Sequence, residues 1–257
     1  MSYIEVRNAY KKYTQDDGEI TVLNDVSIDI EKGEFICLLG PSGCGKSTLL
    51  NALAGFEKVN SGTVKIDGKE VTEPSKKNIT IFQNYGLLPW RNVQKNVELG
   101  LETKDISKQE RAMKAEKYIK LVGLEGFEKR YPRQLSGGQQ QRVAIARGLS
   151  VDPDIIFMDE PFGALDAITR MKLQDDMLRI TREEKKTIIF VTHDIEEAVF
   201  LADRIVVMMA NPGRIKSVVK VPLAGKRDRT NGDFLHVRDK IFELFNLKTE
   251  EYVDYII

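Results

Sequence analysis

An octapeptide near residue 40 has the composition and the setting of a phosphate-binding loop. The segment Gly40–Ser47, GPSGCGKS, follows the apolar run Phe35–Leu39 and precedes Thr48–Ala54, which is compatible with a helix. Glycines let successive backbone N–H groups converge on a phosphate, and a following helix adds its positive N-terminal end. In such a loop Lys46 reaches the β- and γ-phosphates, and the Ser47 hydroxyl ligates Mg²⁺. The pattern therefore predicts a nucleoside triphosphate site rather than a flexible glycine-rich turn.

A second segment, Leu135–Gln139, is suited to hold another anion. Its sequence LSGGQ places Ser136 and two glycines before a run that we expect to be helical from Gln140 to Leu149. Free N–H groups and a hydroxyl at a helix start favour a negative charge. Two phosphate-binding elements in one compact chain predict that one nucleotide is held between two copies of the protein.

Two acidic residues, Asp159 and Glu160, follow the apolar segment Ile155–Met158. Ligands of open α/β sheets bind at the carboxyl ends of the strands. We expect Asp159 to hold Mg²⁺ through water, and Glu160 to polarise or deprotonate the attacking water. Without the loop at Gly40–Ser47, a solvated acidic turn would explain the pair equally well.

His193 follows a strand-like run in the same way. It follows the apolar run Ile188–Val191 and precedes Asp194, which with Glu197 resembles a capping box at a helix start. It could contact the γ-phosphate and position the water. A single histidine is more often a plain surface or core residue, and the other histidine, His236, has no such context.

Gln83 and Tyr13 are weaker candidates. Gln83 follows the strand-like run Ile79–Phe82, so it could reach Mg²⁺ or the water in one position and withdraw in another. Tyr13, or else Tyr10, could offer a ring on which adenine stacks. Taken alone, a solvated glutamine and an ordinary strand aromatic are the commoner explanations.

The elements that position these residues change character along the chain. The first part is mostly strand-like, with a hairpin turn at Asp67-Gly68 and one helix from Lys46 to Gly55. Helical periodicity follows, including a charged helix that starts with the capping box Ser107–Glu110 and ends at Gly123. After Asp154, strands and helices alternate, which predicts a parallel sheet covered by helices. The expected elements there are Ile155–Met158, Ile168–Glu184, Thr187–Thr192, Ile195–Ala202, Arg204–Met209, Arg214–Val221 and a helix from about Asp233.

Composition limits the classes of function. The 257 residues include 39 basic and 39 acidic side chains, and this balance argues against a broad nucleic-acid surface. No apolar run approaches the roughly 18–20 residues that a membrane span needs, and we expect no signal peptide. The two cysteines, Cys37 and Cys44, match no metal-site spacing and fit a reducing compartment. If the protein works at a membrane, another chain must cross it.

Taken together, these motifs occur in the same order along the chain as in the nucleotide-binding subunit of an ATP-binding cassette (ABC) transporter. The resemblance covers nearly the whole chain. The resemblance assigns Tyr13 to adenine, Gln83 to the Q-loop, Ile155–Glu160 to the Walker B strand and His193 to the switch histidine. The catalytic set is then Glu160, His193, Gln83 and Lys46, and the Mg²⁺ set is Ser47, Gln83 and Asp159. The chain's own ATP would contact Gly40, Pro41, Ser42, Gly43, Cys44, Gly45, Lys46, Ser47 and Thr48. The ATP of the partner subunit would contact Ser136, Gly137, Gly138, Gln139 and, from the D-loop, Asp166.

The same resemblance predicts an α/β fold, a P-loop NTPase core with a β-rich nucleotide-binding subdomain and an inserted helical subdomain. The core would comprise residues 1–86 and 150–225, the helical signature subdomain 87–149, and a helical tail 226–257. Two such subunits would pack head to tail as a homodimer, and ATP would close the pair until hydrolysis reopens it.

A narrower resemblance concerns the cargo and the partners. Residues 82–90, FQNYGLLPW, and the later NPGRI and RDR segments resemble importers of nitrate, sulfonate, taurine and related anions, a subgroup that also serves bicarbonate and some pyrimidine or vitamin precursors. This implies permease subunits, a solute-binding protein beyond them, a peripheral place on the cytoplasmic face of the cell membrane, and no nucleic acid. Tyr85, Leu87, Leu88 and Trp90 would either form a groove for a permease helix or pack within the helical subdomain, with equal weight.

Three other functions fit the family less well. A soluble ATPase acting on ribosomes or DNA usually has two cassettes or a long coiled coil, whereas this chain has one cassette and a compact insert. A degenerate cassette that binds ATP without cleaving it would lack Glu160 or His193, and both are present. An exporter subunit would be expected to carry a fused membrane domain.

Overall fold

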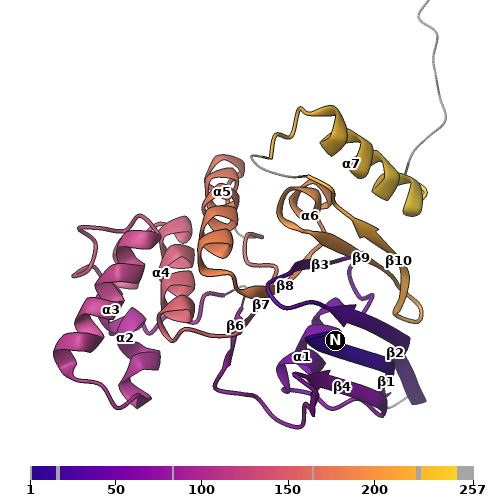
Figure 1. Cartoon of the computed structure of the whole chain (residues 1–257), viewed down its shortest axis with the longest axis horizontal. Coiled ribbons are helices and arrows are strands. Elements are labelled where there is room, and N and C mark those ends of the chain that lie inside the picture. The colour runs from indigo at the N-terminus through magenta and orange to yellow at the C-terminus, as the bar shows by residue number, and fades with distance from the viewer. Residues whose placement is uncertain (1, 16–17, 83, 164, 224–226, 248–257) are drawn as a thin grey trace, which may run out of the picture.

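A six-stranded sheet lies at the centre of the protein (Figure 1). The computed structural model describes residues 2–15, 18–82, 84–163, 165–223 and 227–247. The strand order of the sheet is β10-β9-β3-β8-β7-β6. Neighbouring strands from β9 to β6 run parallel and β10 is antiparallel, which confirms the predicted parallel sheet. The strands are β3 (Phe35–Leu39), β6 (Asn78–Ile81), β7 (Ile155–Asp159), β8 (Thr187–Thr192), β9 (Arg204–Met209) and β10 (Arg214–Lys220).

The strand β3 shows why the central strands read as unbroken apolar runs. Phe35, Cys37 and Leu39 point into one hydrophobic cluster, and Ile36 and Leu38 point into another. Successive side chains of a strand alternate between the two faces of its sheet, so a sheet covered on both faces needs apolar residues throughout. The first cluster includes residues of the helices α4, α5 and α6, and the second includes residues of α1 and of a second sheet.

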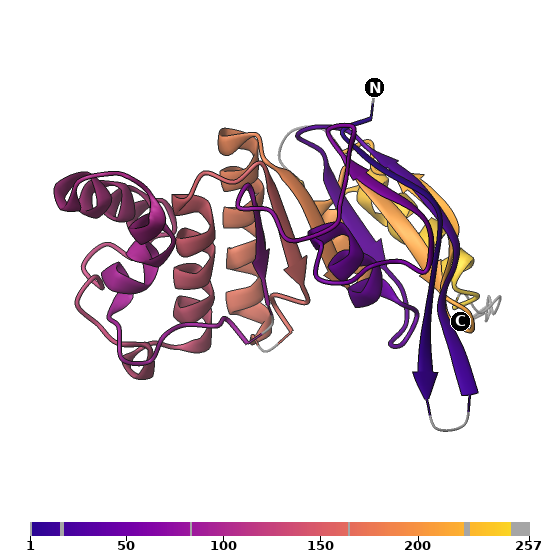
Figure 2. The ribbon, with the colours of Figure 1, turned by 90° about the horizontal axis from the view of Figure 1, so that it is seen from below.

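The second sheet is antiparallel, with the order β2-β1-β4-β5, and the long β1–β2 hairpin projects from the molecule (Figure 2). Asp67 and Gly68 both have positive φ, of 50° and 71°, and connect β4 to β5, which confirms the predicted two-residue hairpin. Helix α1 lies between the two sheets and stops at Gly55, in the left-handed region, as expected. The bounds are β1 (Ile4–Gln15), β2 (Gly18–Ile30), β4 (Ser61–Ile66), β5 (Lys69–Glu70) and α1 (Lys46–Ala54).

Helices from the middle of the chain form a lobe at one end of the molecule (Figures 1 and 2). They are α2 (Val93–Glu98), the 3₁₀ turn η1 (Leu99–Thr103), α3 (Lys108–Leu121), the 3₁₀ turn η2 (Pro132–Gln134) and α4 (Gly137–Ser150). Ser107 caps α3 by accepting from the N–H of Glu110, at 3.1 Å. The start predicted for α4, Gln140, was wrong by three residues, because Ser136 caps the helix and places both glycines in its first turn.

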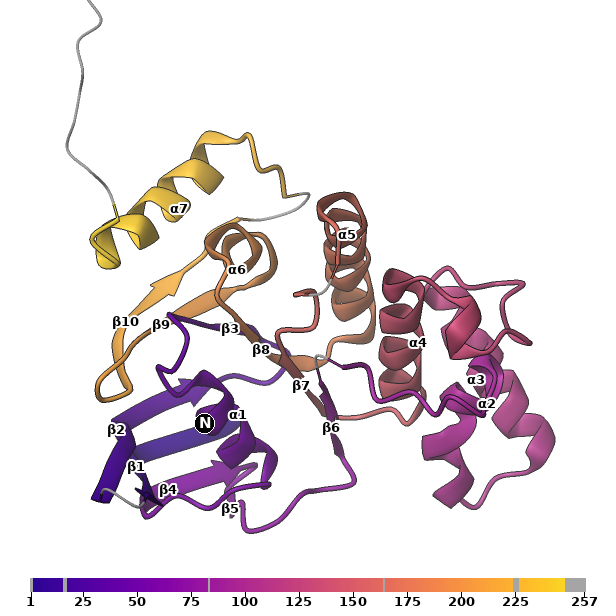
Figure 3. The same ribbon diagram turned by 180° about the vertical axis from the view of Figure 1, so that it is seen from behind.

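Three more helices cover the core. They are α5 (Ala167–Glu184), α6 (Ile195–Leu201) and α7 (Gly232–Leu244). The tail helix α7 buries Phe234, Val237 and Ile241, and α6 and α7 lie side by side in Figures 1 and 3. Within the residues that the structure describes, no helix combines the length and the apolar character that crossing a membrane requires.

Candidate functional site

The loop between β3 and α1 is shaped by close backbone approaches. A Cβ atom at Gly40 would lie 2.6 Å from the carbonyl oxygen of Met208, and one at Gly45 would lie 2.7 Å from Leu23 Cδ2. Gly45 also has φ of 90° and stands at the N-cap of α1. Only glycine fits both demands at Gly45, so the sequence pattern has a direct structural cause here.

Lys46 lies inside this loop. Its side chain is folded back, and Nζ donates to the carbonyl oxygens of Gly40 at 2.7 Å and Pro41 at 2.9 Å. The residue is 5% exposed, whereas Pro41, Ser42 and Gly43 are exposed. The ammonium group is therefore held at the centre of a loop whose outer residues face solvent, at the positive end of α1.

Ser47 faces the first of the two carboxylates. Its hydroxyl donates to Asp159 Oδ1 at 3.1 Å, joining the first turn of α1 to the carboxyl end of β7. Burial raises the pKa of Asp159, and the nearby Glu160 adds to this rise, while the bond from Ser47 opposes it. A hydroxyl and a carboxylate suit Mg²⁺, which takes few protein oxygens and completes its shell with water and phosphate. No group of three metal-binding acidic, His or Cys side chains occurs among the described residues.

Glu160 and His193 lie together at the ends of neighbouring strands. His193 Nδ1 is 3.3 Å from Glu160 Oε2. Glu160 has φ of 44° and donates its N–H to the carbonyl of Val191 in β8. The positive φ turns the chain sharply after β7, which directs the carboxylate towards the next strand end. The parallel pairing of β7 and β8 thus brings these two candidates side by side.

The start of α4 has a reciprocal cap. The Ser136 hydroxyl accepts from the N–H of Gln139 at 3.3 Å, and the Gln139 side chain accepts from the N–H of Ser136 at 3.0 Å. Gly137 is exposed, whereas Gly138 is buried against α5, where a Cβ would lie 2.4 Å from Thr169 Cγ2. The helix start is therefore rigid, and Gly137 is the glycine that faces outwards.

The two phosphate-binding elements lie apart within one chain. Helix α1 belongs to the region between the two sheets, and α4 belongs to the helical lobe, with β6 and β7 between them in Figures 1 and 3. Asp166 caps α5 by accepting from the N–H of Thr169 at 3.0 Å, and Thr169 in turn lies against Gly138 of α4. The residues assigned to the partner's nucleotide thus gather in one place, away from Gly40–Ser47.

Tyr13 lies beside the first helix. Its hydroxyl donates to Glu57, Thr48 in the first turn of α1 is within reach of it, and the Lys11 ammonium lies 4.9 Å from the ring centroid. Burial raises the pKa of Tyr13, and the hydrogen bond to Glu57 adds to this rise. This position next to the phosphate-binding helix suits an adenine-stacking ring. Tyr10 pairs with Ser61 in β4, in the interior of the antiparallel sheet.

Gln83 lies outside the described residues, as does Ala164 of the D-loop. The segment that follows Gln83 is attached to α4 by a residue that the sequence did not single out. Arg147 donates to the carbonyls of Tyr85, at 2.8 Å, and Gly86, at 2.6 Å. Burial lowers the pKa of Arg147. Arg147 is one of two arginines in α4, and nothing in the sequence distinguishes it as the one that holds this segment.

A second set of missed residues supports the His193 loop. The Glu197 side chain does not complete a capping box; instead it accepts from Thr192 Oγ1 at 2.5 Å and from Gln174 Nε2 at 2.8 Å. Gln174 in turn accepts from Arg229 of the tail segment, at 2.5 Å. Asp194 alone caps α6. A buried chain of hydrogen bonds therefore connects the tail with the residue directly before His193.

Comparisons with known proteins identify the family of the chain. A family model described as ABC transporter matches residues 23–163. The aliphatic sulfonates import ATP-binding protein SsuB of Bacillus thuringiensis subsp. konkukian is 44% identical, over 94% of this chain and 95% of that protein. The taurine import ATP-binding protein TauB of Escherichia coli O157:H7 is 48% identical over 82% of each.

A solved structure gives the same answer for the fold. The dimeric post-hydrolysis state of an ATP-binding cassette bound to ADP and Pi superposes with a TM-score of 0.76 and 36% identity. The match covers 86% of this chain and 99% of that one. The chain therefore belongs to the ABC transporter family, in which it is an ATP-hydrolysing subunit of an importer.

Proposed function

We propose that two copies of this chain close head to tail around ATP and thereby drive uptake of a small anion. The observation that supports this most is the separation of α1 from α4 within one chain (Figures 1 and 3). In a head-to-tail pair, Gly40–Thr48 of one copy would face Ser136–Gln139 of the other. The related cassette that is bound to ADP and Pi is a dimer, which supports the same arrangement.

The phosphate loop and the end of β7 would supply the binding groups. Lys46 would exchange its bonds to the Gly40 and Pro41 carbonyls for the β- and γ-phosphate oxygens. Ser47, Asp159 and Gln83 would hold Mg²⁺, which when bound neutralises phosphate charge. Tyr13 would stack on the adenine.

Glu160 and His193 would carry the chemistry. Glu160 Oε2 would accept the proton of the attacking water, and His193, 3.3 Å away, would orient that carboxylate and contact the γ-phosphate. The N–H groups of Gly137 and Gly138 of the partner would spread the charge that develops on the γ-phosphate, and Asp166 would lie next to them. Hydrolysis then removes the bridge between the two copies.

The permease would contact the segment after Gln83. Trp90 is 71% exposed. Phe82 and Phe56 are also exposed, and their ring centroids lie 6.1 Å apart. Tyr85 and Leu87 pack against the core instead, and Leu88 is half-buried, so Trp90 is the one exposed residue of the four anchors predicted from the sequence. Arg147 would transmit movement of this segment to α4, because it holds the carbonyls of residues 85 and 86. Such contact would place the chain peripherally on the cytoplasmic face of the membrane.

The names of the relatives support a proposal about the cargo. The curated relatives named above serve aliphatic sulfonates and taurine, both of which carry a sulfonate group. We propose a sulfonate-type anion as cargo, selected by a solute-binding protein and the permease. Uptake of labelled taurine and of an alkanesulfonate by cells with and without this gene would test this. Uptake unaffected for both would contradict it.

ATP-dependent dimer formation tests the closure mechanism. Glu160→Gln should bind ATP, lose turnover by about 100-fold or more, and accumulate as a dimer in light scattering. Adding Lys46→Ala in that background should return it to monomer, because the γ-phosphate loses its cation. Turnover equal to wild type in Glu160→Gln, or a monomer at saturating ATP, would contradict the proposal.

The exposed tryptophan gives a test of docking. Trp90→Glu should weaken assembly with the permease and leave ATP binding unchanged, because Trp90 makes little contact with its own chain. Met113→Glu is a matched control, since Met113 is also an exposed apolar residue, 63% exposed, on α3 of the same lobe. Equal assembly of both variants with the permease would rule out docking at Trp90.

A further inference from the structure

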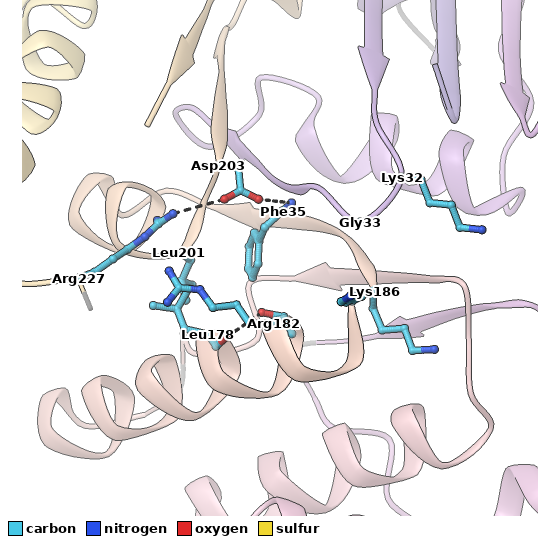
Figure 4. A pocket seen from close by; sticks show the side chains of 11 residues that line it. Lys32, Gly33, Phe35, Leu178, Arg182, Lys186, Leu201, Asp203 and Arg227 are labelled. Atoms are coloured by element: carbon cyan, nitrogen blue, oxygen red, sulfur yellow. Dashed lines mark hydrogen bonds and ion pairs between the residues drawn. The ribbon is translucent and has the colours of Figure 1, made fainter. Parts of the chain in front are cut away.

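A cavity of about 550 Å³ opens at the amino ends of the parallel strands, opposite the carboxyl ends that carry the nucleotide residues (Figure 4). It lies between the turn before β3, the last turns of α5, the junction of α6 with β9, and the tail segment. Its lining residues are Lys32, Gly33, Phe35, Leu178, Thr181, Arg182, Lys185, Lys186, Leu201, Asp203 and Arg227.

The charge of this cavity differs from that of the whole molecule. Its lining includes five basic residues and one acidic residue, Asp203, although the protein has equal numbers of basic and acidic residues. A second cavity, of about 560 Å³, is different in this respect: three lysines line it together with Asp67, Glu70, Glu73 and Asp154. Basic side chains that line the same poorly polarisable surface create a local positive potential, and this potential favours the binding of anions.

Arg227 is the buried basic group of the cavity. Its side chain is 2% exposed, and Nη1 donates to the carbonyls of Val199, Phe200 and Ala202, at 3.1, 2.8 and 2.7 Å. Nη2 lies 3.5 Å from Asp203 Oδ1, and Nε has no partner among the described residues. Burial lowers the pKa of Arg227, and the nearby Arg182 guanidinium adds to this lowering, against the effect of Asp203.

The lysines are only partly neutralised. Lys186 Nζ forms an ion pair with Asp152 at 2.5 Å. Lys32 Nζ lies 5.4 Å from the centroid of the Tyr3 ring, and no carboxylate pairs with Lys32 or Lys185 among the residues that the structure describes. Of the three lysines, Lys32 and Lys185 thus carry the positive charge that no ion pair neutralises within the described part of the chain.

Apart from Gly33 and Thr181, the rest of the lining is apolar. Phe35, Leu178 and Leu201 are nearly buried and contribute side chains to the wall, as Figure 4 shows. We propose that this cavity binds a small organic anion, with an oxoanion head group among the basic side chains and a short apolar chain against the leucines. An apolar wall with a few convergent polar groups is the usual composition of a small-molecule site.

The site would also give the tail segment a role. Arg227 holds the three carbonyls at the C-terminal end of α6, and the other end of α6 follows His193 and Asp194. A ligand in the cavity would contact the residues that fix that end of the helix. This inference does not depend on the identity of the cargo or on dimer closure.

Binding of hexanesulfonate, measured by isothermal titration calorimetry, tests the proposal. The full chain is saturated with Mg·ADP, so that the phosphate loop is occupied. Lys32→Gln combined with Lys185→Asn removes two exposed charges and keeps a residue that tolerates the positive φ of Lys185, 49°. The matched control is Lys69→Gln with Lys76→Gln, which removes two charges from the second cavity.

We expect the Lys32/Lys185 variant to bind hexanesulfonate about five- to tenfold more weakly, and the control variant to bind it like wild type. Hexanol and inorganic sulfate should each bind at least about tenfold more weakly than hexanesulfonate, since each lacks one half of the ligand. In methyl-labelled protein, the resonances of Leu178 and Leu201 should shift. Equal loss of affinity in both variants, unshifted Leu178 and Leu201, or hexanol binding as tight as hexanesulfonate would overturn the proposal.

Discussion

The two glycines that begin α4 have different surroundings, although the sequence presents them as a pair. Gly137 is exposed, and a Cβ there would lie 3.4 Å from the Tyr85 hydroxyl, which is an ordinary contact. A Cβ at Gly138 would lie 2.4 Å from Thr169 Cγ2 of α5. Gly138 is therefore required by packing within its own chain, and Gly137 is the position that reports on contact with a partner.

We expect Gly138→Ala to lower the free energy of unfolding by about 1–3 kcal/mol, because overpacking forces α4 and α5 apart. Gly137→Ala should leave this free energy unchanged or raise it slightly, since alanine is the better helix former. Urea unfolding measures both. Combining Gly138→Ala with Thr169→Ser removes the clashing methyl group and should restore stability; a double variant no more stable than Gly138→Ala would contradict the packing explanation.

Asp159 predicts a pH dependence. Burial raises its pKa above the ordinary aspartate value, so the folded chain binds the proton more tightly than the unfolded chain does. The stability that Asp159 contributes is therefore lost as the pH rises from the ordinary aspartate pKa of the unfolded chain to the raised pKa of the folded chain. Without nucleotide, Asp159→Asn should gain stability relative to wild type across that window and keep the gain at neutral pH.

A matched carboxylate should behave in the opposite way. The N–H of Thr169 lowers the pKa of Asp166, so its contribution is present above the ordinary aspartate pKa and is lost as pH falls through the lowered value. Asp166→Asn should therefore lose stability relative to wild type in the range where Asp159→Asn gains it. Unfolding curves of the two variants that change in the same direction would contradict these assignments.

At the scale of elements, α5, α6 and the tail segment meet in the hydrogen-bond chain Thr192–Glu197–Gln174–Arg229. Arg229 also stacks on Phe200 of α6, with its guanidinium carbon 3.6 Å from the ring centroid. Burial raises the pKa of Glu197, and its bonds to Thr192 and Gln174 oppose this rise. These hydrogen bonds fix Thr192, the residue directly before His193, so Glu197 is a positioning residue.

We expect Glu197→Ala to lower kcat for ATP hydrolysis by about tenfold while KM for ATP changes little, because only the His193 loop is released. Glu197→Gln should retain most of kcat, because an amide can donate to Thr192 and accept from Gln174. Steady-state kinetics of the two variants separates positioning from general destabilisation. A KM that rises as much as kcat falls, or no rescue by glutamine, would contradict this role.

Sequence patterns predicted elements well where a local rule decides the structure. The Asp67-Gly68 hairpin, the start of α1 at Lys46 and the central parallel sheet are of this kind. The start of α4 was missed because two glycines oppose helix formation locally, whereas the reciprocal cap of Ser136 and Gln139 and the packing on Thr169 outweigh that cost.

In the candidate site, the residues placed by strand order were predictable from the sequence, and those that support them were not. The meeting of Ser47 with Asp159 and of Glu160 with His193 follows from strand order, since all four stand at carboxyl ends of the parallel sheet or just beyond them. Arg147, Gln174 and Glu197 were not predicted as supports, because their partners are backbone or side-chain atoms distant in sequence. The spacing of Asp194 and Glu197 even indicated a different role, a capping box, since burial of Glu197 depends on the tertiary fold.

For the whole molecule, the proposal rests on the two candidate halves of an ATP site, which lie apart within each chain. The loop Gly40–Ser47 and the start of α4 at Ser136 lie on opposite sides of β6 and β7 (Figures 1 and 3). Two copies related by a twofold axis would join the halves twice, giving two sites per dimer. The unit of hydrolysis is then the pair rather than the chain.

Complementation between two inactive variants tests this claim most directly. Lys46→Ala disables the loop of its own chain, and Gly137→Asp disables the outward-facing start of α4 with a negative charge; each protein alone should be inactive. Mixed in equal amounts, half of the dimers are mixed, and each of these has one site built from two intact halves. ATP turnover should therefore return to about a quarter of the wild-type rate. Turnover that stays at the level of the separate variants would contradict the shared site, because a site within one chain cannot be repaired by mixing.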